Sequence, residues 1–257
     1  MKKTVKLVAA VLAAALMLSA FAGCALIGKK DDNTLIMATN AAFPPYEYYD
    51  GDTVIGIDAE IAAAIAKELG KELLIEDIDF DSIISTVQGG KADFGMAGMT
   101  VTEERLKNIN FSDTYAKGIQ VVIVPENSPI TTVDDIFADG AAYSIGVQTG
   151  TTGDIYITGD IEGTDNKVER YNNGNDAVLA LANGQIDCVV IDNEPAKAFV
   201  AKQTGLKILD SAYAEEEYAI AIAKDNTELL DQVNDALAKL TEDGTIDAII
   251  GKYIKAE

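Results

Sequence analysis

The 257-residue chain contains no histidine, and arginine is nearly as scarce, since Arg105 and Arg170 are the only two. Without histidine, histidine-based catalytic triads and histidine-ligated metal sites are excluded. Basic residues as a whole are few: 20 stand against 42 acidic residues, which gives a formal net charge of −22. Such acidity argues against nucleic acid and anionic lipid surfaces as partners.

Cysteine is also rare, and the two cysteines occupy different kinds of sequence. A basic start, an apolar run and the small residues of "FAGC" predict that residues 1–23 are a lipoprotein signal peptide, cleaved before Cys24. A lipid on Cys24, helped by a second chain, would anchor the protein to the outer face of the cell membrane, or in the periplasm if an outer membrane exists. An uncleaved transmembrane anchor is the alternative. Cys188, in "IDCVVID", then has no disulfide partner and is expected to be a small buried side chain.

Short apolar runs alternate with helical patterns after a polar linker over residues 24–33. "TLIMATN", "KELLIEDI" and "ADFGMAGMT" predict strands, and "DAEIAAAIAKELG" predicts an amphipathic helix. In the later half "YSIGVQTG" and "DCVVID" predict strands, with a helix starting at about Thr152. This alternation predicts an α/β fold with mostly parallel sheets and helices on both faces.

A faint internal repeat relates residues 83–98, "IISTVQGGKADFGMAG", to residues 177–192, "AVLALANGQIDCVVID". Any two βαβ units share this pattern, so the repeat has a plain explanation. The other explanation is that the chain holds two similar lobes. Because ligands bind beyond the carboxyl ends of strands in such sheets, Gly98 and Asp192 would then lie on opposite walls of one cleft.

Arg105 lies in the first turn of a predicted helix, where a cation opposes the helix dipole. Thr102 is a good N-cap for this helix, and Glu103 and Glu104 suit its first turn. One interpretation is a surface arginine that reaches a distant carboxylate. The other is that Arg105 and the N–H groups near Thr100 hold an anion, for which a planar carboxylate suits the guanidinium fork.

Asp192 closes an apolar strand and has two interpretations, the N-cap of the next helix or an acceptor for an ammonium group. The loop "QTGTTGD" (148–154) lacks the lysine and spacing of a phosphate loop, but its backbone could still hold a small anion. Phe43 is a candidate wall against a ligand side chain. "EEE" (215–217) is interpreted as a solvated face, and "DIDFD" (77–81) lacks the glycine and closing glutamate of a calcium loop. We expect no metal, no cofactor and no catalytic residue.

Three segments in order resemble the extracellular solute-binding proteins of polar amino acid ABC transporters, the family-3 group that includes glutamine- and histidine-binding proteins. They are "ATNAAFPPYEYYDGDTVIGIDAEIAAAIAKELG", "GKADFGMAGMTVTEERLKNINFSDTY" and "IGVQTGTT", and the resemblance runs from about Leu35 to Tyr253. It implies a type II periplasmic-binding-protein-like fold, a two-lobed clamshell with two chain crossings. Lobe 1 would comprise residues 34–117 and 218–257, and lobe 2 residues 118–217.

The resemblance also implies a substrate site. Arg105, Thr100 and the backbone at Thr152 would bind an α-carboxylate, while Asp192 and a carbonyl at Gly98 would bind the ammonium group. The full set of implied substrate-binding residues is Asn40, Phe43, Phe80, Ala97, Gly98, Thr100, Arg105, Gln148, Thr152 and Asp192.

Departures from the family pattern bear on specificity. Asn40 stands where binders of cationic side chains and glutamine binders often have aspartate. Ile191 and Gln148 stand where glutamine binders have histidine and lysine. We therefore expect a neutral or weakly polar free L-amino acid, with sulfur-containing ones among the candidates, delivered by a monomer to a membrane permease. A periplasmic-type dehydratase on the same fold and a ligand-sensing module are the alternatives, although no signalling segment follows Glu257.

Overall fold

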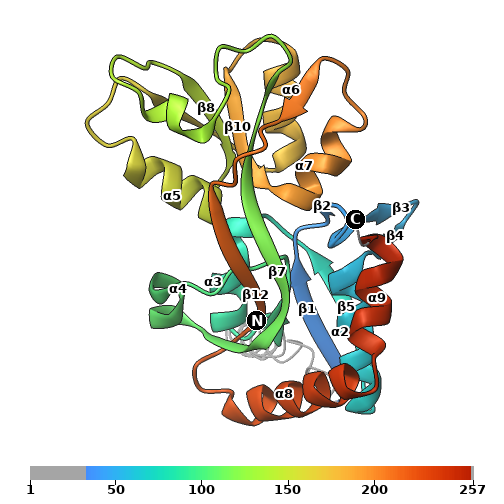
Figure 1. The fold of residues 1–257 in the computed structure, drawn as a ribbon. Coiled ribbons are helices and arrows are strands. Elements are labelled where there is room, and N and C mark those ends of the chain that lie inside the picture. Colours follow the sequence, from blue (N-terminus) through green and yellow to red (C-terminus); the bar gives the residue numbers. More distant parts are fainter. Residues whose placement is uncertain (1–32, 256–257) are drawn as a thin grey trace, which may run out of the picture. The chain divides into compact units, whose positions relative to one another are not determined.

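The computed structural model describes residues 33–255, and the chain from Leu35 onward forms one compact unit. The predicted signal peptide, its cleavage site and Cys24 lie outside the described residues. Figure 1 labels the helices and strands along the chain. No described helix is long and apolar enough to cross a membrane.

The first elements of the chain alternate strands with short helices. In order they are β1 (Thr34–Thr39), β2 (Ala42–Phe43), β3 (Glu47–Asp50), β4 (Thr53–Ile55), α2 (Ile57–Glu68), β5 (Glu72–Asp77), the 3-10 helix η2 (Phe80–Ser82), α3 (Ile83–Gln88), β6 (Phe94–Gly95), α4 (Glu103–Asn108) and the long strand β7 (Asn110–Pro125).

The later elements repeat this style and end in two helices. They are η3 (Val133–Phe137), β8 (Ser144–Gln148), α5 (Thr152–Asp160), β9 (Lys167–Tyr171), α6 (Gly174–Ala182), β10 (Cys188–Asp192), α7 (Asn193–Val200), β11 (Leu206–Ile208), β12 (Ala214–Ile222), α8 (Thr227–Glu242) and α9 (Thr245–Tyr253).

One nine-stranded sheet runs through the described residues in the order β5-β1-β6-β12-β7-β10-β8-β9, with β11 pairing β7. The expectation of mostly parallel strands is only partly right. β1 and β6 are parallel, as are β8 with β9 and with β10, but β7 and β12 pair antiparallel with their neighbours and with each other. The reason is that β7 carries the chain out of one half of the sheet and β12 carries it back (Figure 1).

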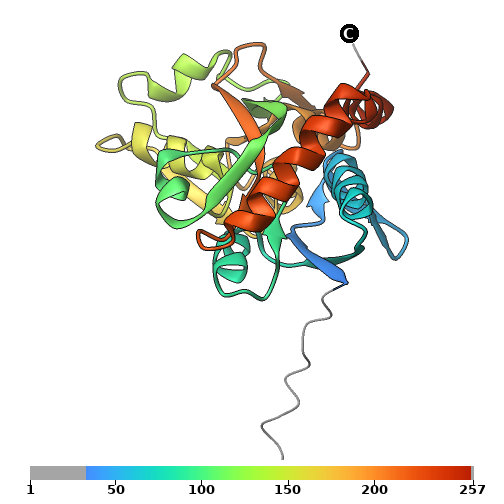
Figure 2. The ribbon, with the colours of Figure 1, turned by 90° about the horizontal axis from the view of Figure 1, so that it is seen from below.

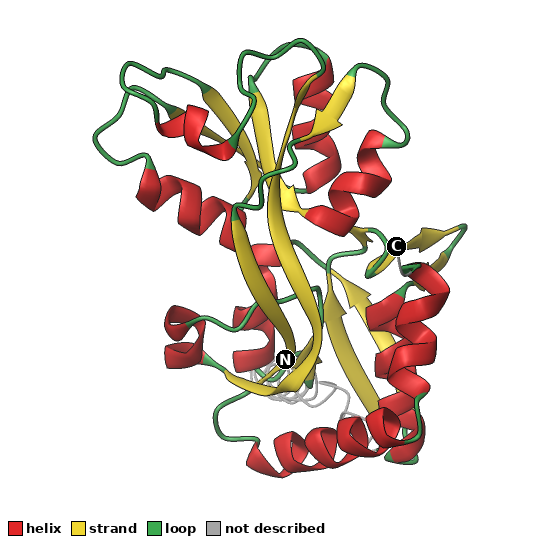
Figure 3. Cartoon of the chain, viewed as in Figure 1, coloured by secondary structure: helices red, strands yellow, loops and turns green. Residues whose placement is uncertain are grey.

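Two lobes result, and each has its own hydrophobic core. In one lobe, β1, α2, α8 and α9 pack around a cluster that includes Met37, Ile61, Ile220 and Leu237. In the other, β8, β10, α5, α6 and α7 pack around clusters that include Val122 and Leu181. Figure 3 shows helices outside the strands in both lobes, and Figure 2 shows α8 beside α2 from below. The two-lobed fold predicted from the sequence is confirmed.

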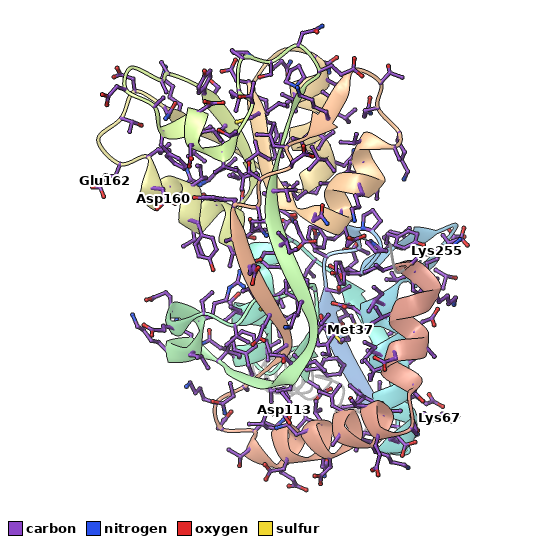
Figure 4. All side chains as sticks on the ribbon, in the orientation of Figure 1. Met37, Lys67, Asp113, Asp160, Glu162 and Lys255 are labelled. Carbon is purple, nitrogen blue, oxygen red and sulfur yellow. The ribbon has the colours of Figure 1, made fainter. Side chains whose placement is uncertain are left out.

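Many apolar side chains of the strands are buried, and many charged side chains are exposed. Met37 is fully buried in β1, whereas Lys67, Asp160 and Glu162 are exposed (Figure 4). Cys188 lies at the start of β10 with no exposed surface, and burial raises the pKa of its thiol to about 12. The prediction that Cys188 is a buried, unpaired side chain is confirmed.

The internal repeat is visible in the hydrogen bonds of the two lobes. Asp93, just before β6, exchanges bonds with Ile36 of β1: its N–H donates to the Ile36 carbonyl and its carboxylate accepts from the Ile36 N–H, both at 2.8 Å. Asp187, just before β10, makes the same two bonds with Ser144 of β8, also at 2.8 Å. The repeat therefore reflects equivalent βαβ units, one in each lobe.

One predicted strand is much shorter than expected. "ADFGMAGMT" forms a strand only at Phe94–Gly95, because Gly98 adopts φ +52°, a left-handed conformation that interrupts pairing. The chain beyond β6 turns across the end of the sheet instead. This turn places Ala97, Gly98 and Thr100 where a ligand can reach them.

Candidate functional site

A cavity lies where the lobes meet. It is lined by Asn40, Phe43, Glu47, Phe80, Ala97, Gly98, Thr100, Arg105, Gln120, Gln148, Thr151, Thr152, Glu216 and Tyr218. Among the described residues it brings together every predicted substrate-binding residue except Asp192. Side chains from both lobes touch across it, since the Gln148 amide donates to Asn40 Oδ1 at 2.9 Å.

Arg105 is buried, with only 6% of its surface exposed, so the interpretation as a surface arginine is wrong. Thr102 caps α4 by accepting from the Arg105 N–H at 3.2 Å, as predicted, and this fixes the residue in the first turn. Its guanidinium donates to the carbonyls of Thr100 at 2.8 Å and Gly150 at 3.1 Å and lies 5.4 Å from the centre of the Phe80 ring.

The charge of Arg105 has no carboxylate partner among the residues that the structure describes. Burial lowers the pKa of Arg105 to about 10, although the charge of Glu216 acts in the opposite direction, so the guanidinium stays charged at neutral pH. A buried cation held by carbonyls and an aromatic face is well prepared to receive an anion.

The start of α5 lies opposite Arg105. Thr151 caps this helix by accepting from the Asp154 N–H, and the helix begins at Thr152, as predicted. Thr152 Oγ1 lies 3.5 Å from Thr100 Oγ1 across the lobes. Hydroxyl groups and the first turn of α5 thus face the same space as the guanidinium, an arrangement that favours negative charge.

Arg170, the other arginine, has a structural task. It forms an ion pair with Asp154 at 2.9 Å and donates to Thr158, both on α5. Asp154 in turn accepts from the Gly150 N–H at 3.0 Å. Arg170 therefore stiffens the loop that carries Thr151 and Thr152 without lining the cavity.

Asp192 serves as the N-cap of α7, accepting from the Glu194 N–H at 3.1 Å. Its other oxygen accepts from the Ile119 N–H at 3.1 Å and from the Tyr218 hydroxyl. Burial raises the pKa of Asp192 to about 7, although these donors act in the opposite direction. Its side chain sits behind Tyr218, which lines the cavity, and the absent side chain of Gly118 makes room for this contact.

The two lining residues that were expected to set ligand specificity, Asn40 and Gln148, are uncharged. The carboxamides of Asn40 and Gln148 bond to each other, and Asn40 also donates to the Ile78 carbonyl at 2.8 Å. Phe43 and Phe80 line the cavity from the β1 lobe, and Phe43 stacks on Tyr46 with ring centres 5.9 Å apart. Aromatic walls and neutral amides suit a polar but uncharged group.

Five lining residues were not predicted from the sequence: Glu47, Gln120, Thr151, Glu216 and Tyr218. The interpretation of "EEE" as a solvated face is wrong at Glu216, which is 5% exposed and accepts from the Gln120 amide at 2.9 Å. Strand alternation carried the signal, because Glu216 and Tyr218 share one face of β12 while Glu215 and Glu217 point outward.

Comparison with known proteins agrees with this geometry. The sequence pattern of bacterial extracellular solute-binding proteins, family 3, matches residues 35–256. The arginine-binding extracellular protein ArtP of Bacillus subtilis is 31% identical over 90% of this chain and 88% of its own, and a probable histidine-binding protein of Neisseria gonorrhoeae is 33% identical over 86% and 83%. An ancestral arginine-binding protein bound to arginine has a TM-score of 0.82 and 37% identity over 86% of this chain and 98% of its own.

These relatives are binding proteins, so the dehydratase alternative falls away and the chain is a solute-binding protein rather than an enzyme. With its two lobes, a cavity between them and a family match over nearly all of the described residues, the chain belongs to the bacterial extracellular solute-binding proteins, family 3.

Proposed function

We propose that the protein captures a free L-amino acid between its lobes and delivers it to the permease of an ABC importer. The observation that carries this proposal is Arg105, a buried cation in a cavity between two lobes with no carboxylate among its described partners. The ligand carboxylate would replace solvent at the guanidinium, Thr100 and the first turn of α5. Asp192 and the Gly98 carbonyl would hold the ammonium group once Tyr218 shifts.

The ligand we favour is neutral or weakly polar. The support is the pair of carboxamides, Asn40 and Gln148, which offers hydrogen bonds without charge between the walls of Phe43 and Phe80. Relatives are named for arginine, histidine and cystine, so the side-chain end of the cavity is where this protein would differ from them.

Delivery would depend on closure of the lobes over the ligand. We place the boundaries at residues 34–117 with 218–257 for one lobe and 118–217 for the other, which agrees with the division of the hydrophobic clusters. Closure would complete the surface that the permease recognises. We further propose that the protein works as a monomer, tethered outside the cell membrane by a lipid on Cys24.

A screen of the purified protein against the common amino acids and cystine tests the proposal. A ligand present at a hundred times its Kd stabilises the folded state by about 2.7 kcal/mol, which corresponds to roughly 5–10 °C in melting temperature for a chain of this size. Calorimetry should then give saturable one-to-one binding. If no amino acid raises the melting temperature or binds, the proposal is wrong.

The pH dependence of binding follows from Asp192. Its carboxyl is half protonated near pH 7 in the ligand-free protein, and an ammonium group nearby would favour the ionised form. Protons therefore compete with the ligand, and affinity should fall by up to about tenfold per pH unit as the pH drops below about 7. Titration calorimetry from about pH 5.5 to about pH 8 measures this.

Asp192→Asn is the matched control for this prediction. It should bind weakly at every pH and should lose the decline at acid pH, because the titrating group is gone. An acid decline that persists in Asp192→Asn would assign it to another group.

A further inference from the structure

Two buried carboxyl groups lie next to the ligand cavity, Glu47 in its lining and Asp58 bonded to Gly98 of that lining. Glu47 begins β3 and Asp58 is the second residue of α2, and neither has exposed surface. The Asp58 N–H donates to the carbonyl of Tyr46, the residue before Glu47, at 2.9 Å, so the two side chains start from neighbouring backbone. Both Glu47 oxygens and Asp58 Oδ1 are buried without a hydrogen-bond partner among the described residues. Two ionised carboxylates can only accept, so a hydrogen bond between them would require one proton. Two like charges on neighbouring buried groups would also repel strongly.

Little around the pair could neutralise a second negative charge. Burial, and after it the charge of Asp58, raises the pKa of Glu47 well above its ordinary range, and Asp77 and Asp192 act in the same direction. Burial raises the pKa of Asp58 only to about 6, because donors from Gly98 and Tyr115 stabilise its ionised form. The other titratable groups that face the pair or share its cavity are Tyr46, Tyr218, Arg105 and Glu216.

The donors divide the two roles within the pair. Asp58 Oδ2 accepts from the Gly98 N–H and from the Tyr115 hydroxyl, both at 2.8 Å. Neither Glu47 oxygen has a donor among the described residues. The proton therefore belongs on Glu47, whose O–H can donate a hydrogen bond to Asp58. The negative charge belongs on Asp58, which accepts from two other donors.

Gly98 connects the pair to the ligand. Gly98 has a φ of +52° and lies against the Phe43 ring. The hydrogen bond from the Gly98 N–H to the Asp58 carboxylate fixes this backbone conformation. Gly98 and Glu47 both line the cavity. We propose that Glu47 and Asp58 share a single proton at neutral pH and that this pair positions the Gly98 wall of the amino acid site. The effect on affinity rests on the proposed function, whereas the proton itself does not.

Infrared spectroscopy tests the proton directly. The difference spectrum between the wild-type protein and Glu47→Gln at neutral pH should contain the carbonyl band of a protonated carboxylic acid. Isotope labelling of glutamate carboxyls should shift that band. A difference spectrum with only carboxylate bands would overturn the proposal, whether or not any amino acid binds.

Thermal stability gives a second readout of the proton. From about pH 4.5 upward the unfolded chain releases the Glu47 proton while the folded protein keeps it, so stability that this group confers is lost as pH rises. Glu47→Gln has no such proton. The difference obtained by subtracting the wild-type melting temperature from that of Glu47→Gln should therefore increase as pH rises. A difference that stays constant across this range would mean that Glu47 is ionised when folded. Glu72→Gln, at the exposed start of β5, controls for the loss of one carboxylate from the surface.

Two substitutions separate positioning from packing. Glutamine can donate to Asp58 as the protonated acid does, so Glu47→Gln should keep ligand affinity within about threefold. Glu47→Ala removes the Glu47 donor from the buried Asp58 carboxylate and should lower ligand affinity at least about tenfold. Cooperative melting would show that this variant still folds. Equal affinities for Glu47→Ala and the wild type would remove the pair from the binding site even if the shared proton is found.

Discussion

Replacing Arg105 with alanine should weaken amino acid binding by about a hundredfold or more. Loss of one partner of a buried, hydrogen-bonded charge pair costs ~2–5 kcal/mol, and about 1.4 kcal/mol is a factor of ten in Kd. The cost is high here because Arg105 is buried and is the only cation, among the described residues, that lines the cavity. Titration calorimetry with the amino acid found in the screen measures the change.

Two matched variants sharpen this result. Arg105→Lys keeps the charge but loses the planar fork and the second carbonyl bond, so its affinity should lie between those of the wild type and Arg105→Ala. Lys107→Ala removes an exposed cation from the same helix and should leave binding unchanged. Near-normal affinity for Arg105→Ala would remove this arginine from the site.

Replacing Gly56 with alanine should lower the free energy of unfolding by about 3 kcal/mol or more. Gly56 has φ +127° and ψ −178°, a region that only glycine adopts readily, and strain there costs about 1–3 kcal/mol. The new Cβ would also lie 2.2 Å from the Tyr46 carbonyl oxygen, so the backbone must move. For a chain of this size the melting temperature should fall by roughly 6–12 °C.

Gly159→Ala is the matched control for Gly56→Ala. This residue lies within α5 with open space around its Cα, and Gly159→Ala should leave stability unchanged or raise it by up to about 1 kcal/mol. A melting temperature of Gly56→Ala equal to that of the wild type would show that the turn before α2 tolerates a side chain.

Much of the fold could be predicted because its signals are local. The N-caps at Thr102 and before Thr152, and the buried strand around Cys188, depend on residues within a few positions of each other. The antiparallel pairing of β7 and β12 could not be predicted in this way. It joins residues about a hundred positions apart, and no local pattern states which strand is their neighbour.

The residues of the site also differ in how far local sequence could predict them. Arg105 and Gly98 were predicted from their motifs and the family resemblance, whereas Glu47 and Glu216 were missed because acidic residues in so acidic a chain carry little information. Asp192 shows a third case, since the sequence left both its interpretations open. The structure shows the N-cap directly, and the proposed contact with an ammonium group still requires Tyr218 to move.

The two-stranded ribbon of β7 and β12 also bears on how fast a ligand can leave. Gln120 lies on one strand, Glu216 and Tyr218 lie on the other, and all three line the cavity. For an amino acid held as proposed, escape requires the lobes to separate, and both connections bend together because they are paired neighbours. Irregular pairing on either side of Ala219 marks where the ribbon can yield. The dissociation rate would thus be governed by the stiffness of a strand pair that also forms a wall of the site.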